Sequence, residues 1–270
     1  MRVALCQIQS QDDPGKNLEL VRAQVRTAAD RGADLAVFPE ATMARFGTSL
    51  RKLAEPVDGP WATAVSALAA EHAITVAAGM FTPGKDGRRV RNTLLVTGPD
   101  GIASYDKIHL FDAFGFRESD TVEPGTAPVV VTIAGVQVGL AICYDVRFPE
   151  LFVDLARQGA TVMVLPASWG NGPGKAEQWE LLVRARALDT VSWLLATGQA
   201  YPPASGLDWG DGPYGIGHSL VAAPDGTVAA ALGQAPDLLV IDIDPETAVT
   251  LRKSIPVLDN RAYTTSAPTG

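Results

Sequence analysis

Two kinds of hydrophobic pattern follow one another along this chain. Short continuous apolar runs, of which DLAVFP at residues 34–39 is the clearest, are typical of strands buried on both faces of a sheet. Between such runs, apolar residues recur three or four positions apart, as at Val21, Val25 and Ala28, and predict amphipathic helices. The regular succession of strands and helices predicts an α/β fold.

The same patterns predict the elements that come next. Pro60 opens a helix, and the apolar run at residues 74–80 forms the following strand. Strand patterns at residues 92–98 and 102–107 flank the turn sequence Pro99-Asp100-Gly101, so this region is predicted to be a hairpin.

The two halves of the chain resemble each other. Residues 29–42 (ADRGADLAVFPEAT) line up with residues 156–169 (ARQGATVMVLPASW), and hairpin residues 92–104 line up with residues 218–230. Two matches in the same order favour an internal duplication and predict two similar α/β layers packed together. Only the first half has a carboxylate, Glu40, after the proline at the strand end, which indicates a chemical role.

Composition narrows the class of function. The chain has 270 residues, 47% hydrophobic and 19% charged, with a formal net charge of −8, so it can bury a large core. No cluster of Lys and Arg recurs, which argues against nucleic acid or an anionic membrane as a partner. We find no signal peptide, no membrane-spanning run and only two cysteines, and therefore expect a soluble, cytoplasmic protein.

Cys143 lies where an apolar strand is expected to give way to a helix. A thiol at a helix N-terminus faces unpaired N–H groups and the positive end of the helix dipole, which favour the nucleophilic thiolate. Cys143 is therefore the candidate nucleophile, although a single cysteine is more often a buried small hydrophobe. Cys6, inside a predicted strand, is expected to be structural.

Two charged residues at strand ends complete a candidate catalytic set. Glu40 could accept a proton as a general base, although an acidic residue here could also cap the next helix. Lys107 could place a cation beside a developing oxyanion, although most lysines are simply solvated. Together with Cys143 they predict a cysteine hydrolase.

The histidines and glycines provide weaker signals. His72, His109 and His218 match no metal-ligand spacing, so we expect no metal site, but a Cys–His dyad through His109 or His218 stays open. No glycine-rich nucleotide fingerprint is present. The Gly/Pro-rich stretch at residues 201–217 is too long for a simple turn and predicts a functional loop.

Three arginines could bind a substrate carboxylate, because guanidinium groups match carboxylates bidentately. They are Arg147, Arg184 and Arg186. Arg184 and Arg186 are two residues apart on a predicted helix and must point to different faces. The alternative for Arg147 is an internal ion pair with Asp145, Glu150 or Asp154.

Five stretches of the chain resemble a known family. The residues around Glu40 (FPEA), Lys107 (YDKIHLFD) and Cys143 (ICYDVRFPEL) resemble the three catalytic motifs of the nitrilase, or carbon–nitrogen hydrolase, superfamily. WELLVRARA at residues 179–187 and GHSLVAAPDG at residues 217–226 resemble two blocks of its Nit-type amidase branch. The likeness covers nearly the whole chain.

The resemblance implies a fold and an assembly. The fold is a single carbon–nitrogen hydrolase domain over residues 1–270, built as a four-layer αββα sandwich with internal pseudo-two-fold symmetry. Members of the superfamily tend to pair into dimers or larger oligomers. We therefore expect a homo-oligomer, with the tail from about residue 256 in a contact between subunits.

The resemblance also assigns roles. Glu40 is the general base, Lys107 the cation on the oxyanion side, and Cys143 the nucleophile. Glu118 is the supporting second glutamate, and the backbone N–H of Tyr144 joins Lys107 at the oxyanion. The candidate substrate-binding residues are Arg147, Ser168 and Trp169. This chemistry needs neither a metal nor an organic cofactor.

The implied activity is that of an amidase, which hydrolyses a small carboxamide to a carboxylic acid and ammonia through a thioester. An ω-amide of a dicarboxylic acid derivative is the implied substrate. The alternatives are hydrolysis of a nitrile or an N-carbamoyl group by the same residues, and acyl transfer by a Cys–His pair. In a different class, the chain is a non-catalytic binding protein on this fold, and the intact catalytic residues argue against that.

Overall fold

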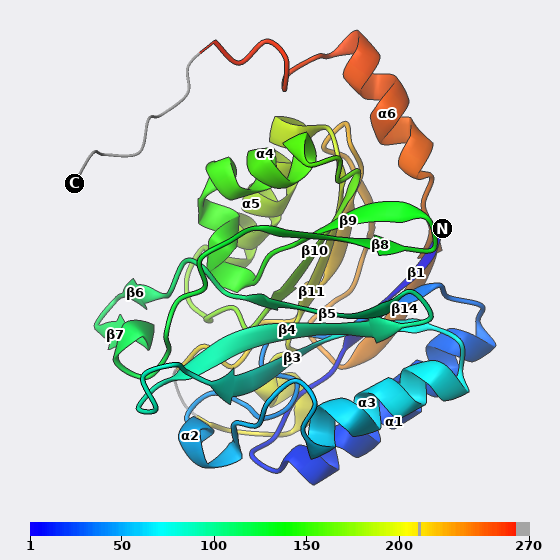
Figure 1. Ribbon diagram of the computed structural model, residues 1–270. Helices are drawn as coiled ribbons and strands as arrows, with labels where there is room; N and C mark the ends of the chain where they lie inside the picture. Colours follow the sequence, from blue (N-terminus) through cyan, green and yellow to red (C-terminus); the bar gives the residue numbers. More distant parts are fainter. Residues whose placement is uncertain (210–211, 263–270) are drawn as a thin grey trace.

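The computed structural model of the protein describes residues 1–209 and 212–262 and contains two six-stranded sheets that face each other (Figure 1). The strands of the first sheet are β1 (Arg2–Gln7), β2 (Leu35–Val37), β3 (Thr75–Pro83), β4 (Val90–Gly98), β5 (Gly101–Asp106) and β14 (Asp237–Asp242). Those of the second sheet are β8 (Val129–Ile133), β9 (Val136–Leu140), β10 (Val162–Ala167), β11 (Trp193–Gly198), β12 (Leu220–Ala222) and β13 (Val228–Ala231).

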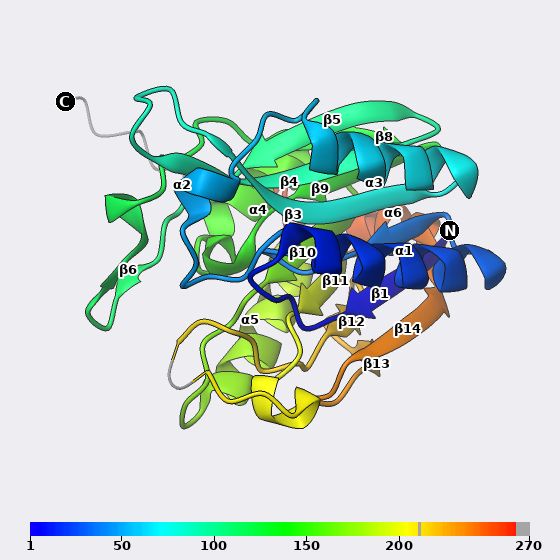
Figure 2. The ribbon, with the colours of Figure 1, turned by 90° about the horizontal axis from the view of Figure 1, so that it is seen from below.

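Helices cover the outer faces of both sheets. The helices are α1 (Pro14–Asp30), α2 (Leu50–Leu53), α3 (Pro60–Glu71), α4 (Pro149–Arg157), α5 (Lys175–Thr190) and α6 (Pro245–Ser254). Seen from below, α1 and α3 run side by side across the first sheet (Figure 2), whereas α4 and α5 lie on the second sheet (Figure 1). Helix α1 begins where the Asp13 carboxylate accepts hydrogen bonds from the N–H groups of Gly15 and Lys16, with Pro14 at its first position.

The two sheets repeat one topology, which confirms the duplication predicted from the sequence. The strand order is β14-β1-β2-β3-β4-β5 in the first sheet and β8-β9-β10-β11-β12-β13 in the second. Strands β1, β2 and β3 of the first sheet are parallel, as are β9, β10 and β11 of the second. The strands next to them, β14 and β4 in the first sheet and β8 and β12 in the second, run antiparallel to them. The architecture is therefore the expected αββα sandwich with internal pseudo-two-fold symmetry.

Alternation along the strands sends side chains into different layers of the core. Val3 and Leu5 of β1 pack between the two sheets, whereas Ala4 and Cys6 pack against α1 and α3. Fully burying a Val or Leu side chain contributes about 1.5–3 kcal/mol, so each layer adds substantially to stability. Burial also raises the pKa of Cys6, which is structural as expected.

The predicted hairpin is present as β4 and β5, with Gly98 opposite Gly101 across the Pro99-Asp100 turn. Gly101 has φ +115°, a conformation that residues with a Cβ rarely adopt, which explains a glycine there. The β12–β13 hairpin follows the same plan around Gly226.

Two expectations concern segments that the structure describes only in part. In the Gly/Pro-rich stretch 201–217, residues 202–205 form a short 3₁₀ turn, and residues 210–211 lie outside the described residues. The tail expected at a subunit contact includes residues 263–270, which also lie outside them. No helix in the described part of the chain is both long and apolar enough to cross a membrane.

Candidate active site

Glu40 stands at the carboxyl end of β2, where the backbone passes close to β3. A Cβ at Gly79 of β3 would lie 2.6 Å from the backbone nitrogen of Ala41, so this approach requires a glycine. The Glu40 side chain is 1% exposed. Its Oε1 accepts hydrogen bonds from Lys107 Nζ at 2.9 Å and Asn92 Nδ2 at 2.7 Å. Its Oε2 accepts one from the Ser168 backbone N–H at 2.8 Å.

Lys107 lies directly after β5 and joins two carboxylates. Its Nζ donates to Glu40 Oε1 and to Glu118 Oε2, each at 2.9 Å. Burial alone would lower the pKa of Lys107, but the carboxylates of Glu118 and Glu40 raise it well above its ordinary value. The ammonium is therefore charged at neutral pH. Because an ammonium has three N–H donors, one is left for a further acceptor.

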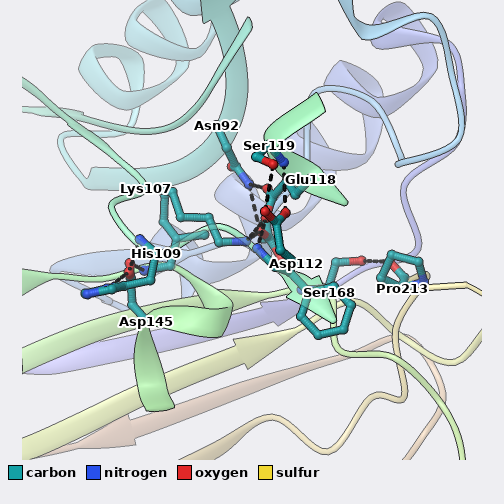
Figure 3. A network of polar contacts seen from close by, with 12 residues as sticks. Asn92, Lys107, His109, Asp112, Glu118, Ser119, Asp145, Ser168 and Pro213 are labelled. Carbon is teal, nitrogen blue, oxygen red and sulfur yellow. Dashed lines mark hydrogen bonds and ion pairs between the residues drawn. The ribbon is translucent and has the colours of Figure 1, made fainter. Parts of the chain in front are cut away.

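Glu118, which the resemblance gives as the supporting second glutamate, lies in a 3₁₀ turn that follows the small hairpin β6 (Asp112–Ala113) and β7 (Phe116–Arg117). Its Oε2 also accepts a hydrogen bond from the Phe111 N–H at 2.7 Å. The Asp112 carboxylate accepts from the N–H and the hydroxyl of Ser119, at 3.0 and 2.6 Å, and so holds the turn (Figure 3). Glu40, Lys107 and Glu118 therefore form one buried network.

Asn92 is a member of this network that sequence reasoning missed. Its Nδ2 bridges the two carboxylates, donating to Glu40 Oε1 and, at 3.1 Å, to Glu118 Oε1 (Figure 3). The side chain is 1% exposed. A polar residue within the apolar strand β4 was the available signal, because a buried amide needs hydrogen-bond partners.

Cys143 does not stand at the start of an α-helix, which corrects the expectation from the sequence. Between β9 and α4 the chain forms a 3₁₀ turn, Cys143–Arg147, and α4 begins only at Pro149. Cys143 itself has φ +47°, in the left-handed region that residues with a Cβ adopt at a cost. The turn presents the thiol at a sharp bend, 8% exposed.

The expectation of a thiolate is wrong as well. Burial raises the pKa of Cys143 well above its ordinary value, and the Glu40 carboxylate raises it further, while Lys107 opposes this shift. The thiol is therefore protonated at neutral pH. To act as a nucleophile the thiol would need a base, and the Glu40 carboxylate lies beside it.

A buried carboxylate, Asp145, holds the turn around Cys143. It accepts hydrogen bonds from the Ile142 N–H at 2.9 Å, the Tyr105 hydroxyl at 2.7 Å and the His109 N–H at 3.0 Å. His109 Nδ1 also lies 2.8 Å from it (Figure 3). Asp145 is thus fully engaged beneath the turn, and the alternative that it pairs with Arg147 is wrong.

The network and the thiol open into one pocket, with about 480 Å³ of empty space including its mouth. It is lined by Glu40, Phe46, Lys107, Phe111, Phe116, Glu118, Cys143, Tyr144, Arg147, Ser168, Trp169, Gly170, Lys175 and Pro213. Neither His109 nor His218 is among these residues, so the geometry argues against a Cys–His dyad. Within residues 1–209 and 212–262, no group of three or more His, Cys, Asp or Glu side chains is placed to hold a metal ion.

The three predicted substrate-binding residues all line this pocket, and each has a hydrogen-bond partner within the protein. The Ser168 N–H donates to Glu40 and its hydroxyl donates to the Pro213 carbonyl in the Gly/Pro-rich stretch (Figure 3). Trp169 Nε1 donates to the Lys175 carbonyl at 3.1 Å, and its ring forms one wall. Arg147 forms no ion pair among the described residues.

Arg184 and Arg186 lie away from the pocket. Arg184 donates to the Gly226 carbonyl at 2.8 Å, and the buried Arg186 pairs with Asp189 at 3.2 Å. Neither is therefore placed to bind a substrate at Cys143.

We compared the sequence and the structure of the chain with those of known proteins. The sequence profile described as carbon–nitrogen hydrolase matches residues 2–253. A hydrolase of Mycobacterium tuberculosis is 54% identical over 97% of this chain and 95% of its own length. The deaminated glutathione amidase of Escherichia coli O157:H7 is 34% identical over 92% of both chains. The structure of Saccharomyces cerevisiae Nit3, a member of branch 10 of the nitrilase superfamily, superposes with a TM-score of 0.84 at 26% identity, over 97% of both chains.

These likenesses span the whole sandwich and define a class. The chain belongs to the carbon–nitrogen hydrolase family, in the Nit-type amidase branch of the nitrilase superfamily. It is an enzyme, a hydrolase that acts on carbon–nitrogen bonds.

Proposed function

We propose that this enzyme is a cysteine-dependent amidase, which converts a small carboxamide to a carboxylic acid and ammonia. The observation that carries the proposal is the position of Glu40. Its buried carboxylate contacts Lys107 and lines the same pocket as a protonated Cys143 thiol. A base, a cation and a nucleophile are thus gathered at one point where an amide carbonyl would bind.

The reaction follows from these groups. Glu40 takes the thiol proton as the sulfur of Cys143 attacks the amide carbon, which forms the C–S bond and a negatively charged oxygen. The oxygen re-forms the carbonyl as the C–N bond breaks, and Glu40 gives its proton to the departing ammonia. Glu40 then takes a proton from water, whose oxygen attacks the thioester, and the proton returns to the sulfur as the acid leaves.

Two donors are available for the negative oxygen. Lys107 uses two of its three N–H groups on Glu40 and Glu118, so the third is free to stabilise that oxygen. We propose the backbone N–H of Tyr144, beside the nucleophile, as the second donor. Glu118 and Asn92 hold Lys107 and Glu40 in place, and this rigid arrangement lowers the cost of reorganisation in the transition state.

We infer that the substrate is an ω-amide of a dicarboxylic acid derivative. Arg147 lines the pocket, and one of its N–H groups donates to Gln178 at 3.2 Å. Without an ion pair of its own among the described residues, it can bind the carboxylate at the far end of such a substrate. The name of the Escherichia coli relative, deaminated glutathione amidase, supports the same class.

The test is ammonia release from a panel of neutral and ω-carboxyl amides, each with its matched nitrile. Cys143→Ala should lower kcat/KM by at least about 10⁴-fold. The control is Cys6→Ala, at the other cysteine, which lies in β1 with its side chain packed toward α1 and α3 and should keep activity. Mass spectrometry of quenched turnover should show an acyl group on Cys143. Release from nitriles alone would identify a nitrilase. Full activity of Cys143→Ala would contradict the mechanism.

We also propose that the enzyme forms a homodimer or a larger homo-oligomer. Leu181 and Leu188 lie seven residues apart, on one face of α5, and are 67% and 51% exposed. An apolar patch on a helix face is a candidate contact between subunits. Light scattering of wild type and Leu181→Glu tests this, and an unchanged monomer in both would contradict it. The cytoplasmic location expected from the sequence stays a prediction.

A further inference from the structure

Lys175 is a pocket residue to which the proposed mechanism assigns no role. It is the first residue of α5, and its side chain lines the pocket that holds Cys143. Its Nζ lies 4.3 Å from the centre of the Phe114 ring, on the loop between β6 and β7. Within the described residues it forms no ion pair, so an aromatic ring is the partner of this cation.

Arg147 lies close to it. The Arg147 guanidinium is 5.3 Å from the centre of the Trp169 ring and 5.8 Å from that of Tyr144. The same Trp169 donates its indole N–H to the Lys175 carbonyl at 3.1 Å. Trp169 therefore contacts both the guanidinium of Arg147 and the backbone of Lys175 along one wall of the pocket.

Within the part of the chain that the structure describes, the pocket carries unpaired positive charge at Arg147 and Lys175. Lys107 is offset by Glu40 and Glu118, both within 2.9 Å of it. Arg147 and Lys175 have no such carboxylate among the described residues, although the whole chain carries a net charge of −8. Burial and the charge of Arg147 lower the pKa of Lys175, so the two cations repel each other, and a bound anion would relieve that repulsion.

We propose that Lys175 determines substrate specificity by forming, together with Arg147, a two-cation subsite for a carboxylate at the end of the substrate remote from the amide. The inference rests on the proposed amidase function and deepens it. A carboxylate is a stronger partner for an ammonium than the face of Phe114, so the substrate displaces that contact when it binds. The amide end of the same molecule then lies at Cys143.

The test compares glutaric acid monoamide with pentanamide, which has the same chain length and a methyl group in place of the carboxylate. The measured quantity is the ratio of kcat/KM for the anionic amide to that for the neutral one. Lys175→Met should lower this ratio about tenfold, mainly by raising KM for the monoamide, because one charge-assisted contact is lost. Lys175→Glu should lower it by about 100-fold, and Lys175→Arg should retain it within about threefold.

The matched control is Lys16→Glu, which changes the net charge equally from the exposed surface of α1. It should leave the ratio unchanged. In wild type the ratio should also fall as salt is raised, and in Lys175→Met this salt dependence should weaken. A ratio that is the same in wild type, Lys175→Met and Lys175→Glu would overturn the inference and leave the amidase proposal standing.

A binding measurement separates this inference from the proposed function. If wild type releases ammonia from neither amide, alkylation of Cys143 by iodoacetamide is followed with and without glutarate. Protection by glutarate in wild type and its loss in Lys175→Glu would support the subsite while the proposed activity fails. Equal protection in both proteins, or none in either, would overturn it.

Discussion

Replacing Lys107 by methionine removes a charge from the centre of the buried network with little change in length. Lys107 and Glu118 are each 2% exposed and Glu40 is 1% exposed, with Nζ at 2.9 Å from both carboxylates. The variant therefore leaves two carboxylates buried without their cation. Removing one partner of a buried ion pair costs about 3–5 kcal/mol. For a chain of 270 residues we expect the midpoint of thermal unfolding to fall by roughly 5–9 °C.

The pH dependence of this deficit follows from the pKa of Lys107. Because the two carboxylates raise that pKa in the folded protein, the lysine stabilises the fold fully below its ordinary pKa, and the contribution is lost only as pH rises through the folded value. Wild type therefore keeps this contribution throughout the range from pH 5 to 9. In the Met variant, uptake of protons by the unpaired carboxylates relieves the folded state, so its deficit should shrink toward pH 5.

The assay is thermal unfolding by circular dichroism at pH 5, 7.5 and 9. Lys107→Arg keeps the charge and serves as the control, and Glu118→Gln added to the Met variant should recover part of the lost stability by removing one unpaired carboxylate. A Met variant that unfolds within about 2 °C of wild type at pH 7.5 would refute this reasoning. So would a large deficit that is equal at pH 5 and 9.

Three further predictions concern groups around the thiol. Asn92→Leu removes the donor shared by Glu40 and Glu118 and should lower kcat/KM about 10- to 100-fold while the circular dichroism spectrum stays native. If the variant keeps the kinetics of wild type, the Asn92 amide is dispensable. Because the Glu40 carboxylate raises the pKa of Cys143, Glu40→Gln should move the pH profile of Cys143 alkylation to lower pH. An unchanged profile would mean that Glu40 does not influence the Cys143 thiol. Ser168 contacts Glu40 through its backbone, so Ser168→Ala should retain kcat within about tenfold in ammonia-release assays, and a loss like that of Cys143→Ala would mean that the hydroxyl itself acts.

The parts of the site that could be predicted stand at the ends of strands. Glu40 and Cys143 follow apolar runs that the sequence marks as buried strands, and Lys107 follows the predicted hairpin. A charged or nucleophilic residue at such a position is visible in a single sequence, because the strand before it has a clear pattern. The duplication was visible for the same reason.

Other parts of the site could not be predicted, because they depend on contacts between distant residues or on the backbone. The N–H of Ser168 binds Glu40 from 128 positions away, and a backbone donor leaves no mark in the sequence. Asp145 was one of three alternative partners for Arg147, but Tyr105 and His109 bind it from 40 and 36 positions away. Asp145 binds these residues because β5 and the segment after it pack against the Cys143 turn.

The state of the thiol was predicted incorrectly because the argument used only local structure. A helix N-terminus favours an anion by about 0.3–1 kcal/mol at an exposed site and up to about 2 kcal/mol when partly buried. Full burial can shift a pKa by several units in the opposite direction, and each unit corresponds to about 1.4 kcal/mol. With Cys143 buried beside Glu40 and no α-helix beginning there, the second effect prevails.

The duplication explains why the two halves contribute different groups to one site. Glu40 and Ala167 occupy equivalent strand ends, and the next residue of the second half, Ser168, donates its N–H to Glu40. If the second strand end also carried a carboxylate, two like charges would be buried close together, and one would have to take up a proton. Ala167 avoids this repulsion, so the first half supplies the carboxylate while the second supplies a neutral donor that orients it. The difference in sequence between these two equivalent positions thus allows the Glu40 carboxylate to stay ionised beside Cys143, as the proposed mechanism requires.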